Sequence, residues 1–314
     1  MTIYLTQRIT GKGKTLNLLV TGASGLLGRA VMNELKEQTT LSVTGTAFRR
    51  AKEPMMKLDL TNCNALKEMI RMIKPGIIIH AAAERRPDVS QRDPDYTREL
   101  NVTATRCLAT AANEIGAWVV YMSTDYVFDG AAPPYAPGSK TNPLNFYGKS
   151  KLDGERALWD STSSACVLRV PVLYGEVESL DESPITVIAK DILKGVPQKI
   201  DNWAIRYPTL VDDVAFVIRQ IIEYRMKYHE FGGTYHWSAD EPYTKYGMAK
   251  IMAPIVGAAE DKILAEDTPP PGAPRPKDSH LDCSELESLG IGRRSPFQSK
   301  IESVLKPFVS GSTS

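Results

Sequence analysis

The stretch Leu16-Asn17-Leu18-Leu19-Val20-Thr21-Gly22-Ala23-Ser24-Gly25-Leu26-Leu27-Gly28 decides the fold that we predict for this chain. A short apolar run ends in small residues, and residues 29–35 then place apolar side chains at helical spacing. This order predicts a strand, a tight glycine turn and a helix. Such a turn leaves free backbone N–H groups and the positive end of a helix dipole where a diphosphate can bind.

Each glycine of this turn has a physical role in that interpretation. Gly22 permits a sharp turn, Gly25 avoids a side chain that would collide with a phosphate, and Gly28 lets the helix pack closely on the strand. Their spacing is G-x-x-G-x-x-G, whereas the standard dinucleotide fingerprint is G-x-G-x-x-G. Taken alone, the three glycines also fit an ordinary strand-to-helix turn.

The composition is that of a soluble globular protein, with 42% hydrophobic and 24% charged residues and a net charge of +1 over 314 residues. This balance gives no reason to expect nucleic acid or an anionic membrane as a partner. No apolar run approaches the ~20 residues of a membrane span. Residues 1–14 lack an apolar segment of signal-peptide type, so we expect residues 1–15 to form a mobile extension.

The cysteines and histidines lack metal-ligand spacing, so we expect no metal site. Cys107 falls in a helical pattern and Cys166 in a strand pattern, which favours buried free thiols and hence a cytoplasmic location. His80 ends an apolar strand and is expected to be a packed core residue. The residues considered are Cys63, Cys107, Cys166, Cys283, His229, His236 and His280.

From residue 16 to about residue 171, apolar runs alternate with helical patterns, which predicts an α/β fold with a doubly wound parallel sheet of Rossmann type. The continuous apolar character of the third strand indicates that both faces of the sheet are covered. Further strands are expected at residues 42–48, 76–83, 117–123 and 165–170, and helices at 64–74, 94–115 and 147–159.

After residue 171 the pattern loosens and predicts a smaller mixed α/β lobe over residues 172–308, closing over the carboxyl edge of the sheet. The helix near 212–225 could instead return to the first domain, which spans residues 16–171. Residues 309–314 are small and polar and are expected to form a disordered tail. Elements are expected at 185–193, 212–225 and 245–256 (helices) and 234–237 (strand).

Phe48-Arg49-Arg50 follows the second strand, at the position that faces an adenosine ribose. An acid there would accept a bond from a 2′-hydroxyl, whereas arginine complements a 2′-phosphate. Two arginines without an acid favour NADP over NAD, although two solvated surface arginines remain the alternative. Asp59 could bond the adenine amino group or could be a helix N-cap.

Tyr147 and Lys151 stand at i and i+4 and therefore share one helix face. A nearby cation lowers the pKa of a phenol from its usual ~10, and Lys151 is the expected cation. Thr124, directly after the fourth predicted strand, could hold a carbonyl while Tyr147 delivers a proton. By itself Tyr-x-x-x-Lys is common on exposed helices, so the ordered combination with the glycine turn is the stronger signal.

Residues 21–28, 123–130 and 147–151 together resemble the extended short-chain dehydrogenase/reductase superfamily. Within it the chain resembles the dTDP-4-dehydrorhamnose reductases and, more closely, their eukaryotic relatives, the regulatory beta subunits of methionine adenosyltransferase. The resemblance covers about residues 16–308. The discriminating segments are residues 82–89, 173–178, 235–238, 275–276, 281–284 and 289–292.

By position, the resemblance implies NADP as the cofactor and Thr124, Tyr147 and Lys151 as the matching catalytic trio. The expected cofactor contacts, to which the glycine turn itself adds Thr21, Gly22 and Gly28, are Ser24, Gly25, Leu26, Leu27, Phe48, Arg49, Arg50, Asp59, Leu60, Ala81, Ala82, Ala83, Arg85, Tyr147, Lys151 and Leu173.

Two departures from the reductases bear on function. Glu84-Arg85-Arg86-Pro87 stands where the reductases carry a His-Thr type segment, which argues against the sugar-nucleotide activity, although a solvated loop is the alternative interpretation. The chain also stops soon after Phe308, whereas the resemblance implies a longer tail that docks into the catalytic subunit. Residues 206–209 could line the cleft or form a helix-capping turn.

The resemblance therefore implies a non-catalytic, NADP-binding regulatory subunit whose partner is the methionine adenosyltransferase catalytic subunit and which modulates S-adenosylmethionine synthesis. The alternative is an NADPH-dependent reductase of a 4-keto sugar nucleotide, which the intact Thr124, Tyr147 and Lys151 favour. A cofactor-sensing scaffold with another partner is a third hypothesis.

Overall fold

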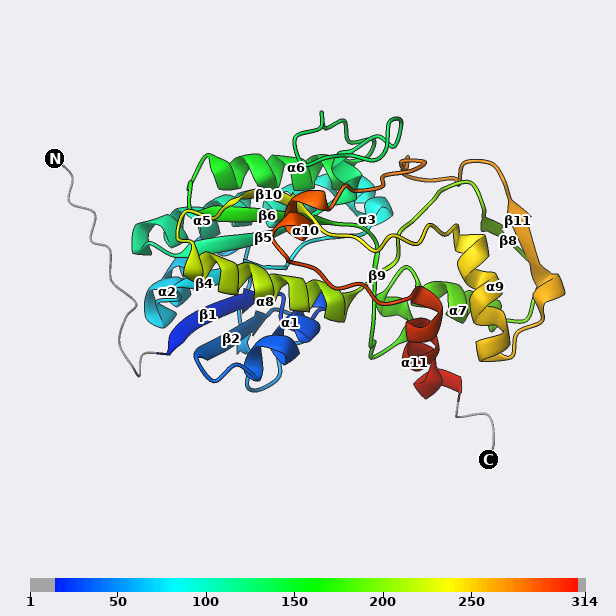
Figure 1. The fold of residues 1–314 in the computed structure, drawn as a ribbon, viewed down its shortest axis with the longest axis horizontal. Helices are drawn as coiled ribbons and strands as arrows, with labels where there is room; N and C mark the ends of the chain where they lie inside the picture. The colour runs from blue at the N-terminus through cyan, green and yellow to red at the C-terminus, as the bar shows by residue number, and fades with distance from the viewer. Residues whose placement is uncertain (1–14, 310–314) are drawn as a thin grey trace.

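The computed structural model describes residues 15–309 and has a seven-stranded sheet at its centre, in the order β10-β6-β5-β4-β1-β2-β3 (Figure 1). Every neighbouring pair in this sheet is parallel, which confirms the predicted doubly wound α/β fold. The strands are β1 (Leu16–Thr21), β2 (Leu41–Ala47), β3 (Met56–Lys57), β4 (Ile77–His80), β5 (Trp118–Thr124), β6 (Ala165–Val170) and β10 (Gly233–His236).

Both faces of the sheet are covered by helices, because the strands are apolar on both sides. Leu18 and Val20 of β1 face a core that also contains residues of α1 and α8, whereas Leu19 faces a core shared with α2 and α5. Helices α1 and α8 pack against each other, as do α2 with α5 and α5 with α6. These helices are α1 (Leu26–Lys36), α2 (Cys63–Ile73), α5 (Ala104–Ile115), α6 (Phe146–Trp159) and α8 (Val211–Lys227).

The helix predicted over residues 94–115 is interrupted by a π-helical turn. It consists of α4 (Pro94–Arg98), the π-helical turn η1 (Glu99–Thr103) and α5. Asn101 lies in the turn, and its side-chain amide donates to the Glu84 carbonyl at 3.0 Å and to the Ser150 hydroxyl at 3.0 Å. The π-helical turn therefore places the buried Asn101 side chain where it connects η1 to the segment after β4 and to α6.

The second half of the chain contributes to the large sheet as well as to a separate cluster of elements. Strand β10 pairs with β6, so the strand predicted at 234–237 lies in the sheet and not in the smaller lobe. Helix α8 packs on α1. The boundary at residues 171–172 stays a prediction.

The remaining elements group at one end of the molecule around a core of their own (Figure 1). Tyr174 and Phe297 are fully buried there, with ring centroids 5.1 Å apart. The elements of this end are β7 (Leu173–Tyr174), α7 (Thr186–Ile192), β8 (Gln198–Asp201), β9 (Thr209–Leu210), α9 (Lys245–Val256), β11 (Ile263–Glu266) and α11 (Phe297–Val309). Short helices elsewhere are α3 (Pro87–Arg92) and α10 (Ser284–Ser288).

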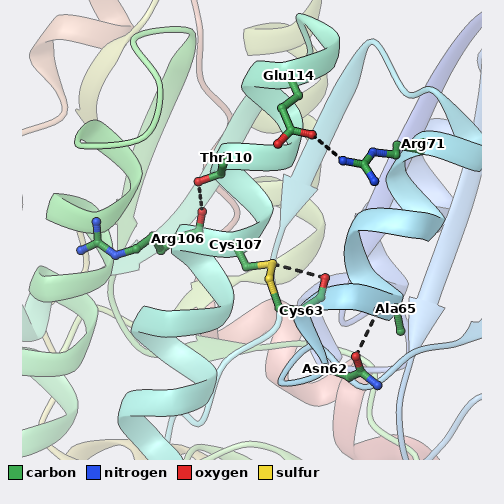
Figure 2. Close-up of a disulfide and its surroundings, with 8 residues drawn as sticks. All are labelled: Asn62, Cys63, Ala65, Arg71, Arg106, Cys107, Thr110 and Glu114. Atoms are coloured by element: carbon green, nitrogen blue, oxygen red, sulfur yellow. Dashed lines mark hydrogen bonds and ion pairs between the residues drawn. A yellow bond between two sulfur atoms is a disulfide. The ribbon is translucent and has the colours of Figure 1, made fainter.

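A disulfide joins Cys63 to Cys107, so the prediction that these two cysteines are free thiols is wrong (Figure 2). It connects the start of α2 to α5, and the Arg71–Glu114 ion pair, at 3.0 Å, joins the same two helices near their other ends. The packing of the helices brings the two Cα atoms to 5.9 Å, which a separation of 44 residues does not reveal. Cys166 and Cys283 are buried and free, as predicted.

The two ends of the chain are only partly covered by the structure. Apart from Thr15 and Val309, the predicted extension (1–15) and tail (309–314) lie outside the described residues, and Val309 itself closes α11. Within residues 15–309, no helix combines the length and the apolar character needed to cross a membrane.

Candidate functional site

The glycine turn after β1 has a backbone that larger residues could not adopt. Gly22 has φ +71°, and a Cβ there would lie 2.9 Å from the backbone of Ala82. A Cβ on Gly28 would lie 2.1 Å from the Gly22 carbonyl oxygen, so α1 can lie against the turn only because residue 28 is glycine. Gly25 caps α1 without a side-chain hydrogen bond, and the first turn of α1 carries no acid. The amide groups of that turn are therefore not engaged by a capping side chain and suit an anion.

Arg50 lies over this turn. Its Nη2 donates to the Ser24 carbonyl at 2.9 Å, and its Nη1 contacts the carboxylates of Glu178, at 3.2 Å, and Glu182. Phe48 and Arg49 are exposed beside it at the end of β2. Arg50, which the sequence predicts to bind a phosphate, therefore lies beside the glycine turn and is paired with Glu178 and Glu182.

Asp59 does not cap α2. Its Oδ1 accepts from the backbone N–H of Thr61 at 3.0 Å and from its hydroxyl at 2.7 Å, whereas Asn62 caps the helix by accepting from the Ala65 N–H. The helix-cap interpretation of Asp59 is therefore wrong. Leu60, beside it, is buried in the core under α2.

The segment after β4 runs alongside the glycine turn. His80 is buried, its Nδ1 is 2.7 Å from the Thr21 hydroxyl and its Nε2 is 3.1 Å from the Thr105 hydroxyl. Burial, reinforced by the charge of Lys151, lowers the pKa of His80 to about 3, so the ring is neutral at pH 7. The predicted core role of His80 is confirmed, and the adjoining residues 81–83 are partly buried.

Glu84 is buried rather than solvated, which excludes the solvated-loop interpretation for this residue. Its carboxylate accepts from the Arg86 backbone at 3.0 Å and from the Arg86 guanidinium at 2.9 and 2.8 Å. Its backbone N–H donates to the Asn101 amide oxygen at 2.9 Å. The neighbouring Arg85 donates from Nη2 to the Glu182 carbonyl, and its charge acts on Tyr147.

Thr124 and Tyr147 are brought together by close packing of α6 on the end of β5. A Cβ on Gly148 would lie 2.1 Å from the Tyr126 carbonyl oxygen, so glycine is needed where α6 begins. Asn145 caps the helix by accepting from the Gly148 N–H at 2.9 Å. The Thr124 hydroxyl donates to the Asp125 carboxylate at 3.1 Å and is close enough to the Tyr147 phenol to act on its pKa.

Burial raises the pKa of Tyr147 above its ordinary value, while the Thr124 hydroxyl and the Arg85 charge act in the opposite direction. The phenol is therefore protonated at neutral pH and can donate a proton. Lys151 is buried with its Nζ 4.0 Å from the Tyr121 ring centroid. Burial lowers the pKa of Lys151 to about 7, against the raising effect of Glu155.

Sequence reasoning missed Asp125 and left Arg206 open. Asp125 is buried next to Thr124, accepts from the Ser279 hydroxyl at 2.5 Å, and has its pKa raised by burial to about 6. Arg206 is buried with its guanidinium 5.8 Å from the ring centroid of Tyr126. The sequence signal for Asp125 is its position directly after a predicted strand. The position of Arg206 beside Tyr126 could be recognised only from the tertiary structure.

The capping-turn interpretation of residues 206–209 is wrong. Helix α8 begins after Leu210, which makes no side-chain cap, and Thr209 pairs instead with Leu173 in the β7–β9 ladder. That ladder holds Leu173, a predicted cofactor contact, at the entrance to residues 175–183.

A model of the RmlD substrate binding domain family matches residues 16–310. The chain belongs to this family. The RmlD-family match spans both the large sheet and the elements grouped around α9. A curated relative from Mus musculus, methionine adenosyltransferase 2 subunit beta, is 46% identical over 294 residues, which are 93% of this chain and 88% of that protein. The chain therefore also belongs to the family of these beta subunits, as the sequence predicted.

Solved structures of RmlD-type reductases have the same fold. A dTDP-4-dehydrorhamnose reductase from Clostridium acetobutylicum has a TM-score of 0.82 and 27% identity, covering 93% of this chain and 99% of that one. The enzyme of the same name from Bacillus anthracis, solved in complex with NADP, has a TM-score of 0.80 and 25% identity, covering 95% of this chain and 100% of that one.

Proposed function

We propose that this chain is an NADP-binding regulatory subunit of methionine adenosyltransferase, which binds the catalytic subunit and modulates S-adenosylmethionine synthesis. The observation that carries the proposal is its 46% identity, over 93% of its length, to methionine adenosyltransferase 2 subunit beta. Glu84 supports a departure from the reductases, because a buried carboxylate anchored by Arg86 occupies the segment where the resemblance to them implies a His-Thr type sequence.

The glycine turn and its surroundings have features that fit NADP. The turn at residues 22–28 approaches its surroundings too closely for larger residues and leads into a helix without a capping side chain, which suits a diphosphate. Arg50 lies beside that turn, which suits an additional phosphate. The proposed contacts are the nineteen positions inferred from the sequence, from Thr21 to Leu173.

The alternative function is reduction of a 4-keto sugar nucleotide, favoured by the placement of Thr124 close enough to Tyr147 to act on its pKa. Bound NADPH would supply a hydride for this chemistry. Thr124 would hold the carbonyl oxygen and Tyr147 would donate the proton, with Arg85 as the cation whose charge acts on the phenol. In the regulatory subunit, the same residues would hold the nucleotide without turnover.

The partner proposal is tested by a pull-down with the methionine adenosyltransferase catalytic subunit, followed by its kinetics with and without this chain. We expect the two chains to co-purify and the KM or kcat of the catalytic subunit to change. Tyr147→Phe should preserve both effects. Turnover of dTDP-4-dehydrorhamnose with NADPH that is lost in Tyr147→Phe would instead favour the reductase.

The cofactor proposal predicts that NADPH raises the Tm more than NADH does at equal concentration. At a free ligand concentration of 100 times Kd, binding adds about 2.7 kcal/mol to the free energy of unfolding. The double variant Arg49→Glu/Arg50→Glu should lose the preference for NADPH, because the cations that match the additional phosphate are replaced by acids. A preference that survives this change would place the phosphate elsewhere.

A cytoplasmic location remains part of this proposal, with weaker support than the sequence suggested. Cys166 and Cys283 are free, but the Cys63–Cys107 disulfide is of a kind that is rare in the cytosol. Alkylation of free thiols at the moment of cell lysis, followed by mass spectrometry, would show whether the bond exists in the cell.

A further inference from the structure

Residues 175–183, which we call the acidic segment, lie against the glycine turn. Glu182 ends the short helical turn η3 (Leu180–Glu182), and its carboxylate accepts from Arg29 at 2.7 and 3.2 Å and from Arg50. It also accepts from the backbone N–H of Glu178 at 2.9 Å. Only 10% of the Glu182 side chain is exposed. This carboxylate is therefore a bound anion, supplied by the chain itself.

The groups that bind Glu182 are groups that a nucleotide phosphate would need. Arg29 directly follows Gly28, and both Arg29 and Arg50 donate to the Ser24 carbonyl at 2.9 Å, which holds their guanidinium groups at the turn. Arg85, another predicted cofactor contact, donates to the backbone carbonyl of Glu182. A single residue thus engages arginines from three segments: the start of α1, the end of β2 and the segment after β4.

Glu182 is ionised at neutral pH. Burial opposes ionisation, but hydrogen bonds from Arg29 and Arg50 lower the pKa of Glu182 to about 2. A carboxylate carries one negative charge, whereas a phosphate monoester carries about −1.5 to −2 and offers three acceptor oxygens. A phosphate monoester therefore competes well with Glu182 for a shared guanidinium.

The acidic segment is anchored at both ends. Tyr174 is fully buried before it, and at its far end the Ser183 hydroxyl donates to the Leu173 carbonyl at 2.7 Å. Ser183 is itself fully buried at the entrance to α7. The contacts that join the middle of the segment to the glycine turn are the ion pairs of Glu182 and Glu178 with Arg29 and Arg50, and a hydrogen bond from Arg29 to the Glu176 carbonyl at 3.2 Å.

We propose that Glu182 takes the place of a nucleotide phosphate in the ligand-free chain, and that NADP binding displaces it from Arg50 and moves the acidic segment. Glu182 is then a determinant of nucleotide affinity, and the acidic segment transmits nucleotide binding to α7 and the elements around it. This inference rests on the proposed NADP binding.

The direct test is calorimetric titration of NADPH into the full chain and two variants. Glu182→Gln removes the competing charge and should tighten binding by at least about threefold, the equivalent of a modest ion pair. Asp181→Asn is the matched control, because it removes the same charge from the same turn but breaks a pair with Lys190 at 2.7 Å. Its Kd should stay that of the wild type.

Hydrogen exchange on the unmodified chain provides a second test that does not depend on a variant folding. NADPH should slow exchange in residues 22–28, which it would contact. Exchange at the Glu178 amide should become faster, because that N–H is bonded to Glu182 at 2.9 Å. Slower exchange at both places would overturn the proposed displacement.

The outcomes separate this inference from the proposed function. If the wild type binds NADPH and Glu182→Gln binds it equally well or more weakly, the displacement is wrong and the cofactor proposal stands. If neither protein binds NADPH, both proposals fall. Binding that is detectable only after Glu182→Gln would support the displacement in its strongest form.

Discussion

His80 illustrates how burial determines the chemistry of a single side chain in this protein. The ring is held between the hydroxyls of Thr21 and Thr105, with its pKa lowered to about 3 by burial and by the charge of Lys151. The unfolded chain has an ordinary histidine pKa of about 6.5 and therefore binds more protons between these two values. The contribution of His80 to stability is thus complete above about pH 6.5 and is lost as the pH falls toward 3.

We predict that, between pH 7 and pH 4, the free energy of unfolding decreases less in His80→Gln than in the wild type. At pH 7 the variant should be less stable by about 1–3 kcal/mol, since one buried hydroxyl loses its partner. Urea unfolding at several pH values measures both effects. His229→Gln, at an exposed histidine, is the control and should follow the wild type. A pH dependence of His80→Gln equal to that of the wild type would contradict the assignment.

The pair Tyr147 and Lys151 shows the limit of reasoning from spacing. Their separation correctly predicts that they share one helix, α6. Tyr147 lies near Thr124, at the carboxyl end of β5, whereas the Lys151 ammonium group lies over the ring of Tyr121 in the same strand. However, the cation that lowers the pKa of Tyr147 in the structure is Arg85, which lies outside the helix. No local pattern predicts this electrostatic interaction, because Arg85 and Tyr147 belong to distant segments of the sequence that only the tertiary structure brings together.

At the scale of elements, α2 and α5 are joined near both ends, by the Cys63–Cys107 disulfide and by the Arg71–Glu114 ion pair (Figure 2). The ion pair is exposed and contributes little by itself. The disulfide closes a loop of 44 residues and restricts the unfolded chain, so it contributes more to stability.

We predict that reduction of this disulfide lowers the free energy of unfolding by about 2–4 kcal/mol. Denaturant unfolding with and without dithiothreitol measures the change, and Cys63→Ser/Cys107→Ser should not respond to the reductant. Thiol titration of the unreduced, denatured chain should count two of the four cysteines, Cys166 and Cys283. A count of four would show that the bond does not form.

At the scale of the whole molecule, the two halves of the chain are interleaved. Strand β10 extends the sheet beyond β6, and α8 covers α1 with fully buried residues such as Val214, Ile218 and Ile221. Both elements follow residue 171 in the sequence. The predicted first domain, residues 16–171, therefore lacks part of its own sheet and core.

We predict that a chain ending at Pro171 does not fold into a stable monomer. It would expose the edge of β6 and the apolar face of α1 that α8 covers, both of which favour aggregation. Circular dichroism during thermal unfolding and size-exclusion chromatography, with the full chain in parallel, provide the test. A monomeric fragment with a cooperative transition would show that the first domain is independent.

Local sequence determined the alternation of strands and helices, the glycine turn, the Tyr147–Lys151 helix and the family. The strands and helices follow from the period of apolar side chains a few positions apart, whereas the turn and the family follow from short motifs along the chain. The helices at 245–256 and 63–73, for example, agree with their predicted ranges to within one residue.

The tertiary structure alone decided which distant segments meet. The Cys63–Cys107 bond, the pairing of β10 with β6, the packing of α8 on α1, and the contact of Arg50 with Glu182 join residues separated by 44 to 185 positions. Such contacts arise because helices and strands pack to bury apolar faces, and side chains then pair with whatever charge lies beside them. Periodicity records which face of an element is apolar but not which distant element covers it.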